Sequence, residues 1–347
     1  MEQRELGTSG IMVSAFCLGS MTWGSQNTEA EGHAQIDMAL DHGINFIDTA
    51  ELYPTTPLSK ETQGDTERIT GSWIKASGRR DEIILATKVS GEGNKNVRDG
   101  APISKATINA ALEVSLTSLQ TDYIDLYQLH WPNRGSYMFR KNWNYDPSGQ
   151  DTAATEDHMA EVLTALDAHV RAGKIRAIGL SNESAWGTIR WLDIARRMNL
   201  PLMQSVQNEY SLLCRLYDTD MAEMSHHEKV GLLAFSPLAA GLLTGKYSNG
   251  AIPPGSRMSI NSTLGGRINE RVWTTIDAYQ KIAAGHGIDL VHMALAFCLQ
   301  RPFTTSVIFG ATSLDQLKHI LNGCDVRLEP QVLEDIIRTH KAHPMPY

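Results

Sequence analysis

Short apolar runs alternate along this chain with longer segments in which apolar residues recur every three or four positions. Such runs are typical of buried strands, and the recurrence is typical of helices with one apolar face. The segment Ser104–Leu119 illustrates the helices, because Ser104 can cap its amino end while Ile108 and Leu112 fall on one face. Eight runs are predicted to be strands: Val13–Leu18, Asn45–Asp48, Ile83–Lys88, Ile124–His130, Ala177–Leu180, Met203–Gln207, Leu232–Ser236 and Ser306–Phe309.

Regular alternation of strands with helices predicts parallel strands joined by helical crossovers. Eight such units close into a (β/α)8 TIM barrel, an α/β fold in which every strand edge is paired. Gln3–Leu6 and Ile11–Val13 flank Thr8-Ser9-Gly10, so they are predicted to form an N-terminal β-hairpin that plugs the bottom of the barrel. No linker composition interrupts the pattern, and we expect residues 1–347 to form a single barrel domain.

Three connections are longer than is usual in this architecture, and we expect these long loops to lie over the C-terminal face of the barrel. They are Pro54–Asp65, Trp131–Asp157 and Leu238–Asn269. The second loop carries four large aromatic residues: Tyr137, Phe139, Trp143 and Tyr145. Two interpretations remain open, a lid that contacts the substrate and a loop that packs its aromatic residues under itself.

Charge and composition exclude several classes of protein. Thirty-one basic residues against thirty-nine acidic ones give a net charge of −8, without a basic run that would follow a nucleic-acid backbone. Met1–Glu5 lacks the pattern of a signal peptide, and Ser236 and Pro237 interrupt the longest apolar stretch. We therefore expect a cytoplasmic protein with neither nucleic acid nor membrane as a partner. The cysteines are too widely spaced to indicate disulfides or a zinc site: Cys17, Cys214, Cys298 and Cys324.

Four polar residues at or beyond the ends of predicted strands suggest a proton-donating site. Asp48, Lys88 and His130 each end a strand, and Tyr53 follows Asp48 by five positions. The carboxyl ends of barrel strands converge on one face, so we expect these side chains to meet. A phenol is a weak acid with a pKa near ~10, and a cation beside it would stabilise the phenolate. Taken singly, each residue also has a purely structural reading, as an ion pair, a packed aromatic ring or a satisfied histidine.

A nucleotide cofactor would have to bind without the usual glycine fingerprint, because no G-x-G-x-x-G follows a predicted strand. Ser181, Asn182 and Gln207 are suited to bonding a carboxamide, and Phe235 to stacking on a flat ring. Lys246 and Arg257 can pair with phosphates, and Gly310-Ala311-Thr312-Ser313 opens a helix whose free N–H groups favour an anion. These features predict a dinucleotide lying across the barrel mouth.

Five motifs in order resemble the aldo-keto reductases, from the opening hairpin through the helix after Gly310. They are Asp48-Thr49-Ala50-Glu51-Leu52-Tyr53, Ala86-Thr87-Lys88, Leu129-His130-Trp131-Pro132, Ile178-Gly179-Leu180-Ser181-Asn182 and Phe235-Ser236-Pro237-Leu238. Four further segments are most similar to the bacterial Tas-like branch, which is related to the potassium-channel beta subunits: Glu51–Pro54, Glu61–Gly64, Gln120–Tyr123 and Leu243–Tyr247.

The resemblance implies an NADPH-dependent reductase that converts an aldehyde or ketone to an alcohol. Tyr53 would be the general acid, Lys88 would lower its pKa, Asp48 would orient Lys88, and His130 would position the carbonyl. The implied substrate-binding residues are Tyr53, His130, Trp23 and Trp131. The implied cofactor-binding residues are Ser20, Met21, Gln26, Asp48, Ser181, Asn182, Gln207, Phe235, Ser236, Pro237, Leu238, Gly241, Lys246, Arg257, Gly310, Thr312 and Gln316. No metal is implied.

The chain departs from the family at the adenosine end of the cofactor. Family members often carry an Arg followed three and four residues later by Glu and Asn, whereas Gln316, His319 and Ile320 occupy these positions here. Ile320 can neither donate nor accept a side-chain hydrogen bond, so weaker adenine recognition is expected. Lys246 and Arg257 match phosphate-binding residues of the channel-subunit branch and favour NADPH over NADH.

Two other functions are less consistent with these residues. A metal-dependent barrel hydrolase is disfavoured because His226 and His227 are adjacent rather than spaced for joint ligation. A non-catalytic, nucleotide-sensing binding subunit, as in the channel beta subunits, is disfavoured by the intact four-residue site. The natural substrate, the direction of the reaction and the choice between monomer and homo-oligomer are not encoded in these patterns.

Overall fold

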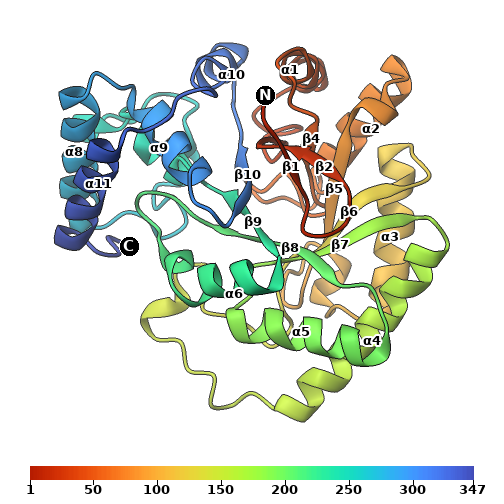
Figure 1. The fold of residues 1–347 in the computed structure, drawn as a ribbon. Coiled ribbons are helices and arrows are strands. Elements are labelled where there is room, and N and C mark those ends of the chain that lie inside the picture. Colours follow the sequence, from red (N-terminus) through yellow and green to blue (C-terminus); the bar gives the residue numbers. More distant parts are fainter.

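Eight parallel strands close into a barrel in the order β10-β3-β4-β5-β6-β7-β8-β9 in this computed structural model, which describes residues 1–347. The helices surround the strands (Figure 1). This confirms the predicted (β/α)8 architecture. The strands are β3 (Phe16–Gly19), β4 (Phe46–Asp48), β5 (Ile84–Val89), β6 (Ile124–Leu129), β7 (Ile175–Ser181), β8 (Met203–Glu209), β9 (Gly231–Phe235) and β10 (Thr304–Phe309).

Side-chain caps begin most of the helices, as the sequence predicted for Ser104, whose hydroxyl accepts from the Thr107 N–H. The helices are α1 (Glu29–Asp41), α2 (Asp65–Ser77), α3 (Lys105–Leu119), α4 (Thr152–Arg171), α5 (Ala185–Met198), α6 (Asp220–Glu228), α7 (Arg257–Ile260), α8 (Glu270–Gly285), α9 (Leu290–Leu299), α10 (Leu314–Leu321) and α11 (Pro330–Ala342). Short 3₁₀ turns are η1 (Arg80–Glu82), η2 (Arg98–Gly100), η3 (Lys141–Trp143), η4 (Leu216–Asp218), η5 (Ala239–Thr244) and η6 (Ser248–Gly250).

The amino-terminal segment forms the predicted hairpin, but the boundary with the first barrel strand differs. β1 (Gln3–Glu5) pairs antiparallel with β2 (Met12–Ser14), and Arg4 lies opposite Val13. The predicted strand Val13–Leu18 is therefore two strands, because the chain bends at Ala15, where the Ser14 hydroxyl donates to the Phe16 carbonyl at 2.6 Å.

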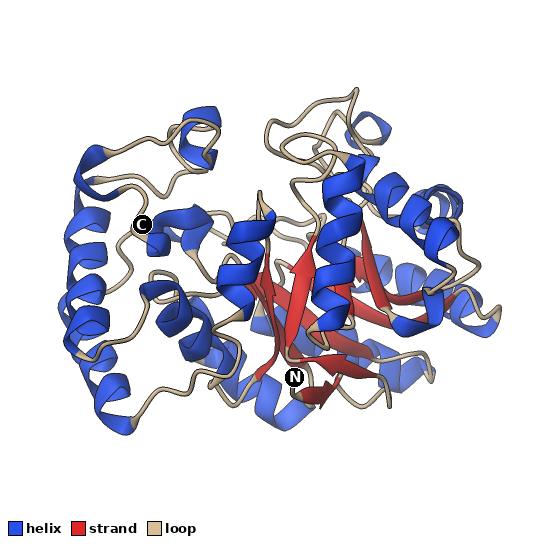
Figure 2. Ribbon diagram, turned by 90° about the horizontal axis from the view of Figure 1, so that it is seen from above, coloured by secondary structure: helices blue, strands red, loops and turns tan.

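The hairpin closes the amino-terminal end of the barrel, opposite the long loops (Figure 2). Leu6, Ile11 and Val13 pack in one buried cluster with inward-facing strand residues such as Phe46 and Leu126. Burial of a Leu or Ile side chain contributes roughly 1.5–3 kcal/mol, so the plug stabilises the barrel as well as covering it. The remaining core lies mainly between the outer face of the strands and the helices.

α9 is apolar apart from His292 and almost wholly buried, which marks it as a core helix. No single helix has the length and apolar character needed to cross a membrane; the α8–α9 pair meets that test jointly by length and composition, but it is bent by 96°. All four cysteines are buried free thiols.

Two of the predicted long loops contain helices that the sequence patterns did not indicate. α4 begins at Thr152, so the connection after β6 ends at Asp151, whose side chain accepts from the Ala154 N–H. That capping signal was present in the sequence and was overlooked. α7, η5 and η6 lie within the predicted loop Leu238–Asn269.

Glu67 on α2 is a buried carboxyl group that should make stability depend on pH. Burial raises the pKa of Glu67 to about 7, although the Thr87 hydroxyl donates to the carboxyl oxygen at 2.5 Å. Because the folded state prefers the protonated form, this stabilising preference is fully present below about pH 4.5 and is lost as the pH rises through about 7. The ionisation costs about 3 kcal/mol at alkaline pH.

Glu67→Gln is therefore expected to be more stable than the wild type at pH 9 and closely similar to it at pH 5. Thermal unfolding followed by circular dichroism at both pH values measures this difference. Glu223→Gln, which changes an exposed carboxylate, is the matched control. Equal shifts of the Glu67→Gln midpoint at the two pH values would mean that Glu67 ionises normally in the folded protein.

Candidate active site

Asp48, Lys88 and Tyr53 meet at the carboxyl end of the barrel, as the strand ends predicted. The Lys88 ammonium donates to Asp48 Oδ2 at 2.6 Å and to the Thr49 carbonyl at 2.8 Å. It lies 3.5 Å from the Tyr53 hydroxyl. Lys88 is fully buried, and Asp48 is 2% exposed. A cation held in this way is directed at the phenol.

Two glutamines hold the Asp48 carboxylate from the other side. Gln207 Nε2 donates to Asp48 Oδ1 at 2.8 Å, and Gln128 Nε2 donates to the same oxygen at 3.3 Å. A buried ion pair is tolerated when hydrogen bonds satisfy its remaining lone pairs, and these amides do so. The sequence reading missed Gln128. Its position two residues before His130 places it on the inward face of β6, and that alternation was the available signal.

The pKa of the Tyr53 phenol shifts in the opposite direction to the one expected from the sequence. Burial raises the pKa of Tyr53 above its ordinary value, and the Lys88 cation opposes this shift without overcoming it. Lys88 thus acts in the predicted direction, but the net shift is upward because the ring is desolvated. Burial also disfavours the Lys88 ammonium, yet attraction to Asp48 and Tyr53 outweighs it and raises the pKa of Lys88. The phenol is protonated and the lysine charged at neutral pH.

His130 lies beside the phenol, with ring centroids 5.6 Å apart and an interplanar angle of 76°. Burial and the Lys88 charge hold the pKa of His130 well below its ordinary value, so the imidazole is neutral. Its Nδ1 is buried without a hydrogen-bond partner. A neutral, partly unpaired imidazole can hydrogen-bond an uncharged substrate oxygen.

The end of β7 presents an unused polar atom. Asn182 has a left-handed backbone with φ of 53°, and its Nδ2 donates to the His130 carbonyl at 3.0 Å. Its Oδ1 is buried without a partner and is therefore free to accept an N–H from a carboxamide. Ser181 Oγ donates to the Gln207 carbonyl at 2.9 Å. The Gln207 amide nitrogen is committed to Asp48, so this residue is first a support of the ion pair.

Three residues in the segment that follows β9, which ends at the half-buried Phe235, have a strained backbone conformation. Ser236, Ala239 and Ala240 have φ of 54°, 48° and 57°. Non-glycine residues hold this conformation at a cost of about 1–3 kcal/mol each, and such residues cluster at ligand sites. At Gly241 a Cβ would lie 3.0 Å from the Lys246 ammonium, so a side chain there would displace the lysine.

Arg257 reaches the mouth without forming any ion pair or side-chain hydrogen bond of its own. Burial, reinforced by repulsion from Arg267, lowers the pKa of Arg257 to about 10. Its charge also acts on the Tyr53 phenol, where it lowers the pKa. A half-buried guanidinium without a counter-ion is suited to an anionic ligand.

The remaining predicted cofactor residues lie around the β3 and β10 ends. Ser20 is fully buried and donates to the Asp48 carbonyl at 2.9 Å, so its hydroxyl has a structural partner. Gln26 Nε2 donates to the Gly255 carbonyl at 3.2 Å and connects two mouth segments. Pro237 is buried, and the other members are at least partly exposed: Met21, Leu238, Gly310 and Thr312.

The residues that differ from the family pattern at the adenosine end of the cofactor make other side-chain contacts. Gln316 Oε1 accepts from both the N–H and the hydroxyl of Thr312 at 3.1 Å. His319 pairs with Asp289 at 3.3 Å, and Ile320 is buried in the core. None of the three side chains copies the Arg, Glu and Asn pattern of the family.

The two tryptophans predicted to bind substrate differ in their burial. Trp23 is fully buried in the hydrophobic core, and its indole nitrogen donates to Gln35 Oε1 at 3.0 Å. Trp131 is half-buried and lies 4.9 Å from the His130 ring. Its packing requires Gly91, where a Cβ would lie 2.4 Å from the indole.

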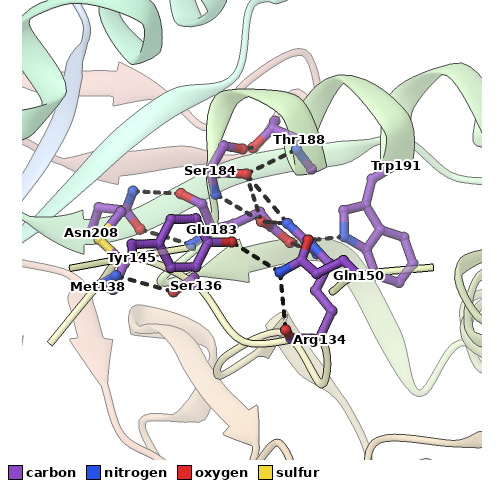
Figure 3. A network of polar contacts seen from close by, with 11 residues as sticks. Arg134, Ser136, Met138, Tyr145, Gln150, Glu183, Ser184, Thr188, Trp191 and Asn208 are labelled. Carbon is purple, nitrogen blue, oxygen red and sulfur yellow. Dashed lines mark hydrogen bonds and ion pairs between the residues drawn. The ribbon is translucent and has the colours of Figure 1, made fainter. Parts of the chain in front are cut away.

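A polar network missed in the sequence anchors the loop after β6 (Figure 3). The Arg134 guanidinium forms a bidentate ion pair with buried Glu183, which also accepts from the Trp191 indole at 3.3 Å. Gln150 donates to the Arg134 carbonyl at 3.1 Å. A cavity of about 360 Å³ lies under this loop, lined in part by Trp131, His158, Met159 and Trp191.

Some aromatic residues of this loop fit a loop that packs on itself, and others remain available to contact a substrate. The Tyr137 and Tyr145 rings pack on each other with centroids 6.0 Å apart, which fits a self-packed loop. Phe139 and Trp143 are exposed, and the Trp143 ring lies 5.0 Å from the Arg271 guanidinium.

Comparisons with known proteins show the family of the chain. The model of the aldo/keto reductase family matches residues 15–340. "Protein tas" of Escherichia coli (strain K12) is 43% identical over 100% of this chain and 99% of its own length. "Uncharacterized oxidoreductase YrpG" of Bacillus subtilis (strain 168) is 31% identical over 96% and 94%. "Probable voltage-gated potassium channel subunit beta" of Arabidopsis thaliana is 29% identical over 99% and 98%. The family and branch suggested by the motifs are confirmed.

Proposed function

Because the chain belongs to the aldo/keto reductase family, we propose that it reduces an aldehyde or a ketone to an alcohol with NADPH, using Tyr53 as the general acid. The chain is an oxidoreductase, and its family generally uses a nicotinamide cofactor on small carbonyl compounds. The observation that carries the proposal is the Lys88 ammonium, bound to Asp48 at 2.6 Å and 3.5 Å from the Tyr53 hydroxyl.

The residues of this chain supply the proton and its environment. The neutral His130 hydrogen-bonds the substrate oxygen beside the phenol. Tyr53 donates its proton to that oxygen, and Lys88 stabilises the phenolate that remains. Asp48, held by Gln207 and Gln128, keeps the ammonium in place.

The mouth also fits the cofactor. Asn182 Oδ1 would accept from the carboxamide, Phe235 would stack on the nicotinamide ring, and Lys246 and Arg257 would hold the phosphates. When bound, the reduced nicotinamide supplies a hydride to the carbonyl carbon. Following NADPH absorbance across a panel of aldehydes and ketones tests the activity, and a fully inert panel would count against it.

Replacing both Lys246 and Arg257 with Ala is expected to narrow the preference for NADPH over NADH at least about tenfold. Each cation forms charge-assisted bonds to phosphate, and only NADPH carries the additional phosphate. Nucleotide titrations followed by intrinsic fluorescence give the ratio of the two dissociation constants. Lys318→Ala, which removes an exposed cation from α10, is the control. An unchanged ratio in the double variant would move the phosphate site away from these residues.

A second candidate function is a non-catalytic, nucleotide-sensing binding subunit. It is supported by relatives named as channel beta subunits that align with nearly the whole chain. A complete proton-donating site supports catalysis instead. Two experiments together separate the reductase from the binding subunit: a pull-down against membrane proteins and the panel of aldehydes and ketones. We further propose cytoplasmic location, no nucleic-acid or membrane partner, and a monomer or homo-oligomer.

A further inference from the structure

One carboxylate at the barrel mouth holds two cations that the proposed reaction does not use. Glu209 is the last residue of β8 and is 8% exposed. Arg140, from the loop after β6, donates to it from Nη1 at 2.7 Å. Arg267, from the loop after β9, donates from Nε at 2.9 Å, and the Tyr347 hydroxyl donates at 3.3 Å. Two guanidinium groups on one carboxylate leave one positive charge without a partner.

The unbalanced charge belongs to Arg140. Every nitrogen of Arg267 has a partner, since Nη2 also reaches Glu209 at 2.7 Å and Nη1 donates to the Leu264 carbonyl at 2.8 Å. Arg140 forms only the Nη1 bond, and its Nε is buried with no partner. The Nε and Nη2 atoms form the side edge of a guanidinium, which binds a carboxylate through two parallel hydrogen bonds.

Two glycines lie next to this unpaired edge of the Arg140 guanidinium. Gly265 and Gly266 have φ of 67° and 86°. A Cβ at Gly265 would lie 3.6 Å from Arg140 Nη2, and one at Gly266 would lie 3.6 Å from Arg140 Nε. The two glycines therefore place no side chain against this edge, and the Gly265 N–H donates to no protein acceptor. An edge of two donors and a free backbone N–H make a cradle for a small anion.

Glu209, which holds Arg140, lies on the same strand as Gln207. Gln207 bonds Asp48, and Glu209 follows on the same face of β8, about 7 Å further along the strand. In the barrel register Glu209 is paired with Phe235. Glu209 and the Arg140 guanidinium bonded to it therefore lie beyond Gln207, toward the carboxyl end of the barrel.

We propose that Arg140 binds a carboxylate of the substrate, so that the preferred substrates are carbonyl compounds bearing an acidic group. This inference rests on the proposed reductase function. Lys246 and Arg257 account for the phosphates of the cofactor, whereas Arg140 comes from the loop that follows His130. Carboxylate is favoured over phosphate because one unpaired charge and one planar edge match a single carboxylate.

The test compares the three positional isomers of carboxybenzaldehyde with their neutral methyl esters. For at least one isomer, the wild type should reduce the acid with a kcat/KM at least tenfold above that of its ester. Arg140→Gln should remove this preference, mainly through KM, and leave the esters within threefold. Arg140→Lys, which keeps the charge without the planar edge, should retain only part of the preference. Lys141→Gln, an exposed neighbour without an ion pair, is the control.

Several results would overturn the inference. No preference for any acid in the wild type would do so, as would equal losses on acid and ester in Arg140→Gln, which would make Arg140 a loop anchor. A weaker dissociation constant for NADPH in that variant would assign the cradle to the cofactor. Calorimetric titration of benzoate and benzamide onto the NADP⁺-bound protein does not need turnover. If no aldehyde reacts, the proposed function fails, while tighter binding of benzoate that depends on Arg140 still supports the cradle.

Discussion

Tyr53→Phe is expected to lower turnover at least about a hundredfold while the cofactor binds almost as tightly as in the wild type. Phenylalanine keeps the ring and removes only the transferable proton. The single protein contact of the hydroxyl is the Lys88 ammonium at 3.5 Å, so the fold loses little when it is removed. Because burial raises the pKa of Tyr53, the wild-type rate should fall only at alkaline pH, where the phenol loses its proton.

Steady-state reduction of the best aldehyde, together with nucleotide titration, measures both quantities. Tyr123→Phe is the matched control, because that ring lies before β6 and stacks under Arg80 at 3.9 Å, away from the mouth. Retention of more than about a tenth of wild-type turnover by Tyr53→Phe would show that another group donates the proton. A large loss of NADPH affinity would instead assign the phenol to binding.

Lys88→Met is expected to reduce turnover at least about a hundredfold and to destabilise the fold by about 3–5 kcal/mol. The first effect follows from the loss of the only cation bonded to the phenol, which leaves the Tyr53 phenolate unstabilised. The second follows because Asp48, 2% exposed, keeps a buried charge without its partner. Chemical denaturation and steady-state kinetics on the same preparations measure the two effects.

The double variant Asp48→Asn/Lys88→Met separates stability from chemistry. Removing both charges should recover most of the lost stability, since Asn still accepts from Gln207 and Gln128, but it should recover none of the turnover. If the double variant regained turnover, Lys88 would have only a structural role. If Lys88→Met were as stable as the wild type, the buried ion pair would contribute nothing to the fold.

The proximity of Asp48, Tyr53, Lys88 and His130 was predictable because these residues obey local rules. Asp48, Lys88 and His130 each terminate an apolar run, and parallel strands bring their carboxyl ends together. Pairwise charge reasoning gave the sign of the Lys88 effect on the Tyr53 pKa but not the net shift. Desolvation of the ring depends on neighbours distant in the sequence, and its effect on the Tyr53 pKa is larger than that of Lys88.

The mouth could not be predicted in the same way. Glu209 contacts partners 58, 69 and 138 positions away in sequence, and no periodicity encodes such pairings. The burial of Trp23 was equally unpredictable, because its indole N–H donates to Gln35 on α1 and its ring packs in the core.

The Gln207 amide links two sites that are usually considered separately. It donates to the carboxylate that positions the lysine, and it lies at the strand end predicted to face the carboxamide of the cofactor. A ligand that reorients this amide would also perturb the Asp48–Lys88 pair, and by thermodynamic reciprocity the state of that pair would alter the affinity for the ligand. Cofactor occupancy and proton donation would then be coupled through one side chain.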